Sequence, residues 1–184
     1  MAAPHRSWAA SLLHLWFHEL EPSDWWGGLA RVDALLASRY QRWLEALKTR
    51  SPREFLDNPQ TALAAVILFD QAPRNLYSGT ARAFAYGPLA RAIMEGALAR
   101  GWDKDLPPVQ RQFLGMPLMH SEAIADQRRS LAYFRHMHRR YGFPFARDHY
   151  RMIARFGRYP HRNEVLGRRS TEAEERAIAA GFAW

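Results

Sequence analysis

The chain has 184 residues, a net charge of +8 at pH 7 and no cysteine. This length suits one compact domain that buries about two thirds of its unfolded surface, so we predict a single domain over residues 1–184. Without cysteine, disulfides and thiolate metal sites are excluded. No window approaches about 18 uninterrupted apolar residues, which argues against a membrane-spanning helix, and residues 1–20 lack a signal-peptide pattern. We expect a cytoplasmic protein.

The positive charge raises the question of nucleic-acid binding. Of the 26 basic residues, only Lys48 and Lys104 are lysine. The arginines are spread along the sequence, and the nearest approach to clusters is the adjacent pairs at 128–129, 139–140 and 168–169. Phosphate-driven binding depends on clustered cations. We therefore predict no specific nucleic-acid partner, and only weak, salt-sensitive binding to RNA or DNA.

Hydrophobic periodicity is helical almost throughout, and no segment shows convincing strand alternation. The pattern predicts an all-α fold with helices over residues 7–20, 29–48, 60–72, 79–100, 108–115, 118–141, 144–156 and 171–181. Thr171 and Glu174 form a capping box that starts the last helix. Short connections favour an array of antiparallel helical hairpins. A tetratricopeptide-like solenoid fits the helix lengths, although no clean 34-residue repeat is visible.

The predicted helix 118–141 places polar residues on an apolar face. Steps of three and four join His120, Ile124, Gln127, Leu131, Phe134 and His138. His120 and Gln127 should therefore point inward. A buried polar group without a partner costs about 1–3 kcal/mol, so both side chains need partners inside the protein. His149 repeats this pattern in the predicted helix 144–156.

The predicted helix 60–72 ends in a group of polar residues. Asp70 follows a nearly continuous apolar run and shares its buried face. Pro73 lacks a backbone donor and disfavours a helical residue before it, so the helix should end or kink there. The resulting turn presents Gln71, Arg74 and Asn75. Two interpretations stay open: an Asp70–Arg74 ion pair that closes the helix end, or a ligand site.

The loop over residues 155–168 is dense in hydrogen-bonding side chains. Gly157, Pro160 and Gly167 give it tight turns and a rigid frame. Guanidinium groups bind carboxylates and phosphates in bidentate fashion, so converging arginines favour an anion clamp. The loop offers Arg158, His161, Arg162, Asn163 and Arg168. In the alternative interpretation, its arginines pair with Asp70, Glu122 and Asp126 and lock the loop onto the helices.

Three sequence phrases resemble a bacterial family known as "domain of unknown function 924". They are FDQAPRN over 69–75, PLMHSE over 117–122 and RFGRYPHRNEVLGR over 155–168. The resemblance runs from about residue 13 to residue 182 and implies a divergent tetratricopeptide-type helical fold. Most of the matching positions are polar, which is more typical of a site than of packing. Ser78 and Gly87 depart from the family pattern, where relatives carry arginine and aspartate.

These observations predict one polar cleft formed by the turn 70–75, the segment 120–127 and the loop 155–168. The leading hypothesis is that it binds a small anionic metabolite or an acidic peptide group. The ligand-binding residues would be Gln71, Arg74, Asn75, Gln127, His149, Arg158, Arg162, Asn163 and Arg168.

Two further hypotheses use the same fold differently. A metal-independent hydrolase or proton-transfer enzyme would use His120 or His161 as acid or base, oriented by Asp70 or Glu122. A scaffold would instead bind protein through a concave helical surface.

Sequence motifs of known chemistries are absent. There is no HExxH, G-x-S-x-G, P-loop or dinucleotide fingerprint. We expect no cofactor and no metal, although His120, His149, His161 and Asp70 could assemble a zinc site from separate helices. The sequence does not indicate an oligomeric state.

Overall fold

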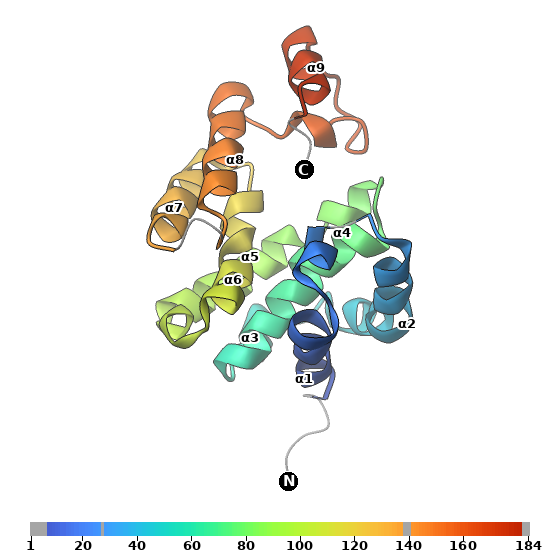
Figure 1. Ribbon diagram of the computed structural model, residues 1–184, viewed down its shortest axis with the longest axis vertical. Helices are drawn as coiled ribbons and strands as arrows, with labels where there is room; N and C mark the ends of the chain where they lie inside the picture. The colour runs from blue at the N-terminus through green and yellow to red at the C-terminus, as the bar shows by residue number, and fades with distance from the viewer. Residues whose placement is uncertain (1–6, 27, 138–140, 182–184) are drawn as a thin grey trace. The chain divides into compact units, whose positions relative to one another are not determined.

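The computed structural model describes residues 7–26, 28–137 and 141–181. Every regular element in these ranges is helical, which confirms the predicted all-α class (Figure 1). The chain divides into two compact units: residues 1–78 with 82–117, and residues 79–81 with 118–184. Each unit is described by itself. The single domain and the tetratricopeptide-like hairpin array stay predictions.

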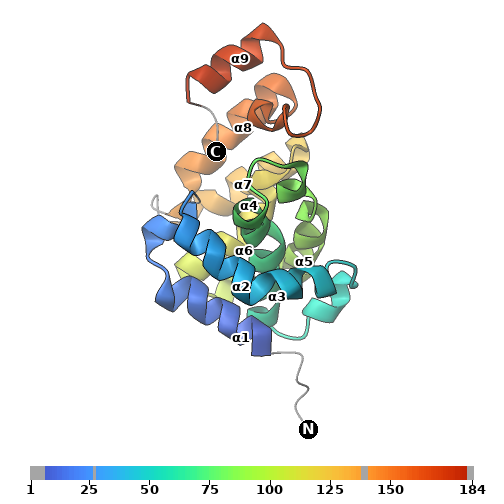
Figure 2. The same ribbon diagram turned by 90° about the vertical axis from the view of Figure 1, so that its right-hand side faces the viewer.

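Six helices contribute to the first unit. They are α1 (Ser7–His14), α2 (Ala30–Leu47), α3 (Pro59–Val66), α4 (Ala72–Leu76), α5 (Gly87–Ala99) and most of α6 (Pro108–His120). Here α3 packs against α1 and α5, and α2 packs against α4 (Figure 2). Every side chain of α3 from Thr61 to Val66 is buried. A helix that is apolar on all sides belongs in a core, so α3 forms the centre of this unit.

Short turns connect these helices. They are 3-10 turns over Pro22–Trp26, Pro52–Phe55, Ala81–Phe84 and Trp102–Asp105, and π turns over Leu15–Glu19 and Ile67–Gln71. None of the helices in the described residues is long and apolar enough to cross a lipid bilayer.

The helix end predicted at Pro73 is not observed. α3 ends at Val66, a π turn over Ile67–Gln71 follows, and α4 begins at Ala72 with Pro73 in its first turn. The missing N–H of a proline is tolerated in a first turn because that donor has no partner inside the helix. Ala72 keeps helical φ and ψ, so the helical backbone continues through Pro73 to Leu76.

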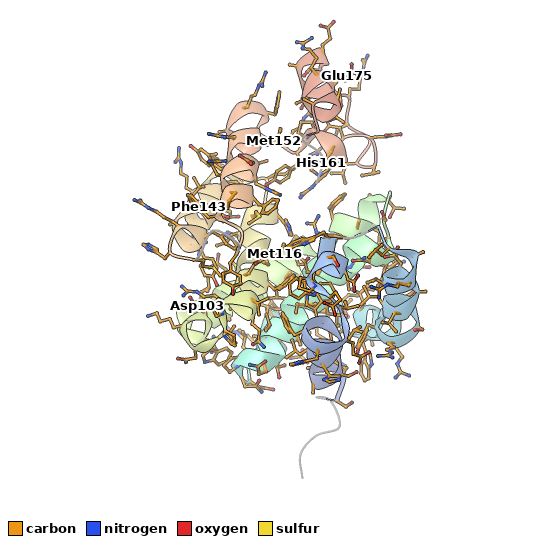
Figure 3. All side chains as sticks on the ribbon, in the orientation of Figure 1. Asp103, Met116, Phe143, Met152, His161 and Glu175 are labelled. Carbon is orange, nitrogen blue, oxygen red and sulfur yellow. The ribbon has the colours of Figure 1, made fainter. Side chains whose placement is uncertain are left out.

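The second unit contains α7 (Ile124–Arg135), α8 (Phe143–Phe156) and α9 (Glu172–Ala179), together with the end of α6. α7 packs along α8. A small core joins α8, the loop after it and α9. Its members are Met152, labelled on α8 in Figure 3, and Ile153, Tyr159 and Ala177.

The predicted capping box at the start of α9 is confirmed. The Thr171 hydroxyl accepts the N–H of Glu174 at 3.3 Å. In return, the Glu174 carboxylate accepts the N–H of Thr171 at 2.8 Å. Two backbone donors of the first turn are thereby satisfied.

The continuous helix predicted over 118–141 is wrong. α6 runs on to His120, residues 121–123 are non-helical, and α7 begins at Ile124. The Ser121 hydroxyl accepts the N–H of Ala123 at 3.2 Å, a local hydrogen bond that competes with the helix.

This break changes the predicted helix face. His120 now belongs to α6, so it does not share a face of one helix with Gln127. Ile124, which we expected to point inward, is exposed. Gln127 and Phe134 are fully buried as predicted. His138 lies outside the described residues.

The predicted start of the helix 79–100 is also wrong. α5 begins at Gly87, and Ala81–Phe84 forms a 3-10 turn before it. Pro88 occupies the first turn of α5, where its fixed φ and missing donor favour a helix start. The apolar pattern before residue 87 therefore belongs to a separate turn.

Gly96 lets α5 approach the segment after Pro52–Phe55 closely. A Cβ atom at position 96 would overlap the Leu56 side chain, whereas one at Gly87 in the same helix would meet nothing within 4 Å. We predict that Gly96→Ala lowers the free energy of unfolding by about 1–2 kcal/mol, because overpacking outweighs the gain in helix propensity. Urea unfolding measures the difference.

Gly87→Ala is the matched control and should leave stability within about 0.5 kcal/mol. Adding Leu56→Ala to Gly96→Ala should make the glycine substitution less costly than it is alone, because the overlapping side chain is gone. A Gly96→Ala protein as stable as the wild type would contradict the packing described for α5.

Candidate functional site

The predicted site residues fall into both units, so two groups are described separately. Asp70, Gln71, Arg74 and Asn75 lie in the first unit. The second unit holds His120, Glu122, Gln127, His149, Arg158, His161, Arg162, Asn163 and Arg168. The single cleft that would combine both groups stays a prediction.

Side chains of the polar group in the first unit contact one another and Asp33. Arg74 Nε donates to the main-chain oxygen of Asp70 at 3.0 Å, and the Arg74 guanidinium lies 4.0 Å from the Asp70 carboxylate. Gln71 Nε2 donates to Asp70 Oδ2 at 2.5 Å. Asn75 Nδ2 donates to Asp33 Oδ1 at 2.8 Å. The Asp70–Arg74 ion pair of the first interpretation is present, and the ligand site of the second stays a prediction.

Gln127 holds the break between α6 and α7 in the second unit. Its Nε2 donates to the main-chain oxygens of Met119 at 2.7 Å and Ser121 at 2.6 Å. It also lies 2.8 Å from the Tyr159 hydroxyl, which donates to the Met119 oxygen at 2.5 Å. The side-chain amide thereby satisfies carbonyls that the interrupted helix leaves without intrahelical partners. The predicted inward, hydrogen-bonded Gln127 is confirmed, with a structural role.

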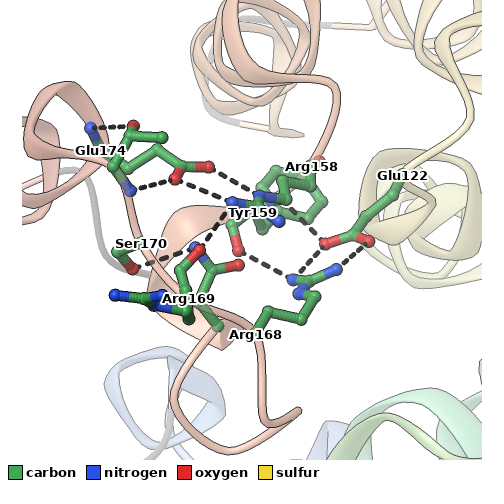
Figure 4. A network of polar contacts seen from close by, with 9 residues as sticks. Glu122, Arg158, Tyr159, Arg168, Arg169, Ser170 and Glu174 are labelled. Carbon is green, nitrogen blue, oxygen red and sulfur yellow. Dashed lines mark hydrogen bonds and ion pairs between the residues drawn. The ribbon is translucent and has the colours of Figure 1, made fainter.

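Glu122 lies in the same break and fixes the loop by both carboxylate oxygens (Figure 4). Oε2 accepts Arg168 Nη1 at 2.8 Å, and Oε1 accepts Arg168 Nη2 at 3.0 Å and the Tyr159 N–H at 2.8 Å. Burial alone would raise the pKa of Glu122, but the Arg168 guanidinium and the Tyr159 N–H outweigh it and hold the pKa below its usual value. Glu122 is therefore an ionised anchor.

Arg158 forms a second fork, with Glu174 of α9 (Figure 4). Its Nε and Nη2 donate to the two carboxylate oxygens at 2.7 and 2.9 Å, and Nη2 also donates to the Arg169 oxygen at 2.9 Å. Glu174 is almost wholly buried. The hydrogen bond from Arg158, aided by the Thr171 cap, lowers the pKa of Glu174 to about 2.

Asn163 closes the loop from inside. Its side chain is 1% exposed, and Nδ2 donates to the Ser170 hydroxyl at 3.0 Å. Its main-chain oxygen accepts the Arg168 N–H at 2.8 Å. Asn163 thus contributes to the loop's own geometry.

The remaining predicted residues gather around Tyr159. We call His120, His149, Tyr159, His161 and Arg162 the histidine cluster. Ring centroids are 6.2 Å apart for His120 and His149, 5.5 Å for His149 and Tyr159, and 5.6 Å for Tyr159 and His161. The three histidines come from the end of α6, from α8 and from the loop. His149 and His161 contact the Tyr159 ring, and His120 contacts His149.

Arg162 joins the histidine cluster through a ring contact and a main-chain hydrogen bond. Its guanidinium lies 4.2 Å above the Tyr159 ring, and Nη1 donates to the main-chain oxygen of His120 at 3.0 Å. Arg162 and His149 are buried, whereas His120 and His161 are partly exposed, and both ring nitrogens of His161 are buried. The cluster therefore combines a buried positive charge with three imidazoles.

His149 has a defined ring orientation. Its Nδ1 lies 2.8 Å from the Phe145 main-chain oxygen. A carbonyl oxygen can only accept, so Nδ1 carries the proton and Nε2 is the position at which a proton is gained or lost. Within the part of the chain that the structure describes, no three His, Cys, Asp or Glu side chains are arranged to hold a metal ion.

Two residues in this network received no role from the sequence. Tyr159 is fully buried within the histidine cluster, and its signal was an aromatic residue inside a very polar loop. The sequence predicted that Glu174 caps α9, but not that its carboxylate also binds Arg158. The predicted partners of the loop arginines included Glu122, which binds Arg168, but not Glu174.

Comparisons with known proteins agree with the sequence motifs. The model of the family "Bacterial protein of unknown function (DUF924)" matches residues 12–181. A solved structure of a protein of unknown function from Agrobacterium tumefaciens is similar, with a TM-score of 0.88 and 32% identity. The match covers 94% of this chain and 97% of that one. None of the curated proteins matches this chain.

The Arg158–Glu174 pair predicts a pH dependence of stability. The pKa of Glu174 is about 2 in the folded protein against an ordinary value of 4.5. The pair therefore stabilises the fold above pH 4.5, and this contribution is lost as the pH falls through about 2. Glu174→Gln should lower the free energy of unfolding at pH 7 by about 1–3 kcal/mol, a range that allows for the partly exposed arginine.

Urea unfolding of wild type and Glu174→Gln at a series of pH values checks this. Their difference should shrink steadily below pH 4.5. The exposed neighbour Glu175 provides the control, and Glu175→Gln should stay within about 0.5 kcal/mol of the wild type. A difference for Glu174→Gln that stays constant down to pH 3 would rule out the ion pair as its source.

Proposed function

The chain belongs to the bacterial family of unknown function DUF924, and we propose that it binds a small anion at the histidine cluster of its second unit. The anion would be the phosphate or carboxylate group of a metabolite or an acidic peptide. One observation carries the proposal: three histidines from separate segments are linked by ring contacts, His149 and His161 to Tyr159 and His120 to His149, and a buried arginine joins them.

The division of the arginines supports this location. Arg158 and Arg168 each hold a carboxylate in a bidentate fork, so their charges are compensated locally. Arg162 donates to the main-chain oxygen of His120, which ties it to the histidines. We therefore propose Arg162, His120 and His161 as the residues of the anion clamp that we predicted from the loop as a whole.

The histidines make the proposed binding pH-dependent. An unperturbed imidazole has a pKa of about 6.5 and carries a positive charge below it. Protonated imidazoles at His120 and His161 would add two positive charges to that of Arg162. The affinity for an anion whose own charge is constant should rise as the pH falls through this range.

Acid–base catalysis at the histidine cluster is the second candidate. The fixed ring of His149 favours it, because an imidazole held by one nitrogen presents the other in a defined direction. The orienting role that we predicted for Glu122 has no support, since Arg168 and the Tyr159 N–H occupy its oxygens. An orienting role for Asp70 and the scaffold hypothesis stay predictions.

Sulfate is a suitable probe because it stays doubly charged from pH 5.5 to 8. We expect the ring signals of His120 and His161 in NMR spectra to shift on sulfate addition at pH 5.5, with a Kd of about 1 mM or lower. The Kd should be at least about tenfold higher at pH 8, a difference of about 1.4 kcal/mol.

His161→Ala should weaken sulfate binding by about tenfold or more. His136→Ala is the control, because His136 is an exposed histidine at the end of α7 in the same unit. A titration with acetylated glutamate then tests a carboxylate ligand. The proposal fails if neither anion shifts the His120 and His161 signals at about 10 mM, ten times the Kd of a weak complex. It also fails if both alanine variants weaken binding equally.

A further inference from the structure

The positive charge of the chain is divided unevenly between the two units. Residues 118–184 carry 13 arginines and 7 aspartates and glutamates, which gives this part of the second unit a net charge of +6. Residues 1–117 carry the remaining +2. Most of the excess charge is therefore concentrated in about a third of the chain.

Three of these arginines form a stripe on α8. Arg147, Arg151 and Arg155 are spaced four residues apart, so they lie along one side of the helix, and all three are exposed. With a rise of 1.5 Å per residue, the stripe is about 12 Å long. The opposite side of α8, with Ala146, His149, Met152 and Ile153, is buried. The helix thus brings arginines that are separated in the sequence onto one exposed side of α8.

Few carboxylates offset this stripe. Asp148 is the one acidic residue in the sequence of α8, and it lies 3.3 Å from both Arg147 and Arg151. These two arginine side chains remain 49% and 66% exposed. A single carboxylate shared by two exposed guanidinium groups leaves a net positive surface.

The helix next to α8 adds to the charge. Arg128 and Arg135 are exposed and seven residues apart on α7, which packs along α8. Residues seven apart lie on the same side of a helix. Arg129 lies 3.7 Å from the Asp126 carboxylate, which compensates part of its charge.

We infer that the exposed side of α8 is a sequence-independent binding face for the phosphate backbone of nucleic acid, centred on Arg147, Arg151 and Arg155. Each DNA strand carries one phosphate per about 3.4 Å of helix axis, so a stripe of about 12 Å reaches about three phosphates. Guanidinium groups bind phosphate oxygens in bidentate fashion. Such contacts position a protein on the backbone without reading bases, in agreement with the absence of a specific nucleic-acid partner predicted from the sequence.

A membrane surface is the other polyanion with which such a stripe could interact. An interfacial helix needs an apolar side that enters the lipid in addition to its cations. Of the apolar residues of α8, Met152 and Ile153 are buried in the core of the second unit, and Phe145 is exposed as a single large apolar side chain. The duplex is therefore the occupant that the structure favours, and anionic vesicles become one arm of the test.

The test is the salt dependence of binding by the full chain. Fluorescence anisotropy with a labelled 20-base-pair DNA duplex would be measured from 50 to 200 mM salt, and repeated with a second sequence. The slope of the logarithm of the association constant against the logarithm of the salt concentration should be about −2 or more negative. Both DNA sequences should give similar slopes. The triple variant R147Q/R151Q/R155Q should make that slope less negative by about 2–3, since each phosphate contact contributes about 0.9.

Two triple variants serve as matched controls. R42Q/R50Q/R53Q removes the same charge from exposed positions of the first unit and should leave the slope unchanged within about 0.5. R147K/R151K/R155K keeps the charge and should keep most of the slope. If R147Q/R151Q/R155Q unfolds, the single variant Arg151→Gln should still change the slope by about 1.

Three results would overturn the inference. The first is an absence of duplex binding at 50 mM salt. The second is an equal change of the slope in R147Q/R151Q/R155Q and in R42Q/R50Q/R53Q, because net charge alone would then account for binding. The third is stripe-dependent binding to vesicles with anionic lipid while the duplex is not bound, which would identify a membrane face.

Discussion

The structure of the second unit depends on the carboxylate of Glu122. It lies in the break between α6 and α7, and it accepts hydrogen bonds from Arg168 at one end of the loop and from the Tyr159 N–H at the other. Tyr159 is thereby held where its hydroxyl reaches the Met119 oxygen and the Gln127 amide. One ionised side chain thus sets the position of the loop and of the ring around which the histidines gather.

The arginines of the loop have two different surroundings: two are paired with carboxylates, and one lies beside the histidines. Arg158 and Arg168 hold Glu174 and Glu122 in forks, which is the geometry in which guanidinium groups bind carboxylates most strongly. Breaking such a partly buried pair leaves an uncompensated charge, so these two arginines serve the fold. Arg162 lies beside the histidines, where its guanidinium contacts the Tyr159 ring and the His120 oxygen.

Features that depend on neighbouring residues could be predicted from the sequence better than the pairing of residues that lie far apart in it. The Thr171 capping box depends on neighbouring residues and could be predicted, whereas the helix end expected at Pro73 is not observed. The break at 121–123 could not be predicted, because Gln127 stabilises it only by reaching back to carbonyls of α6. The pairing of Arg158 with Glu174 was missed for a similar reason: several carboxylates were available, and tertiary packing selects among them. The predicted site residues could be identified, but not divided into structural and ligand-facing groups.

The free energy of unfolding of Arg158→Lys tests the central claim, that Arg158 and Arg168 hold the fold, most directly. Lysine keeps the charge but cannot make two parallel hydrogen bonds to Glu174 and a third to the Arg169 oxygen. We predict a loss of about 1–3 kcal/mol, against a change within about 0.5 kcal/mol for Arg155→Lys, an exposed arginine at the end of α8. An Arg158→Lys protein as stable as Arg155→Lys would contradict the claim and restore Arg158 as a candidate for ligand binding.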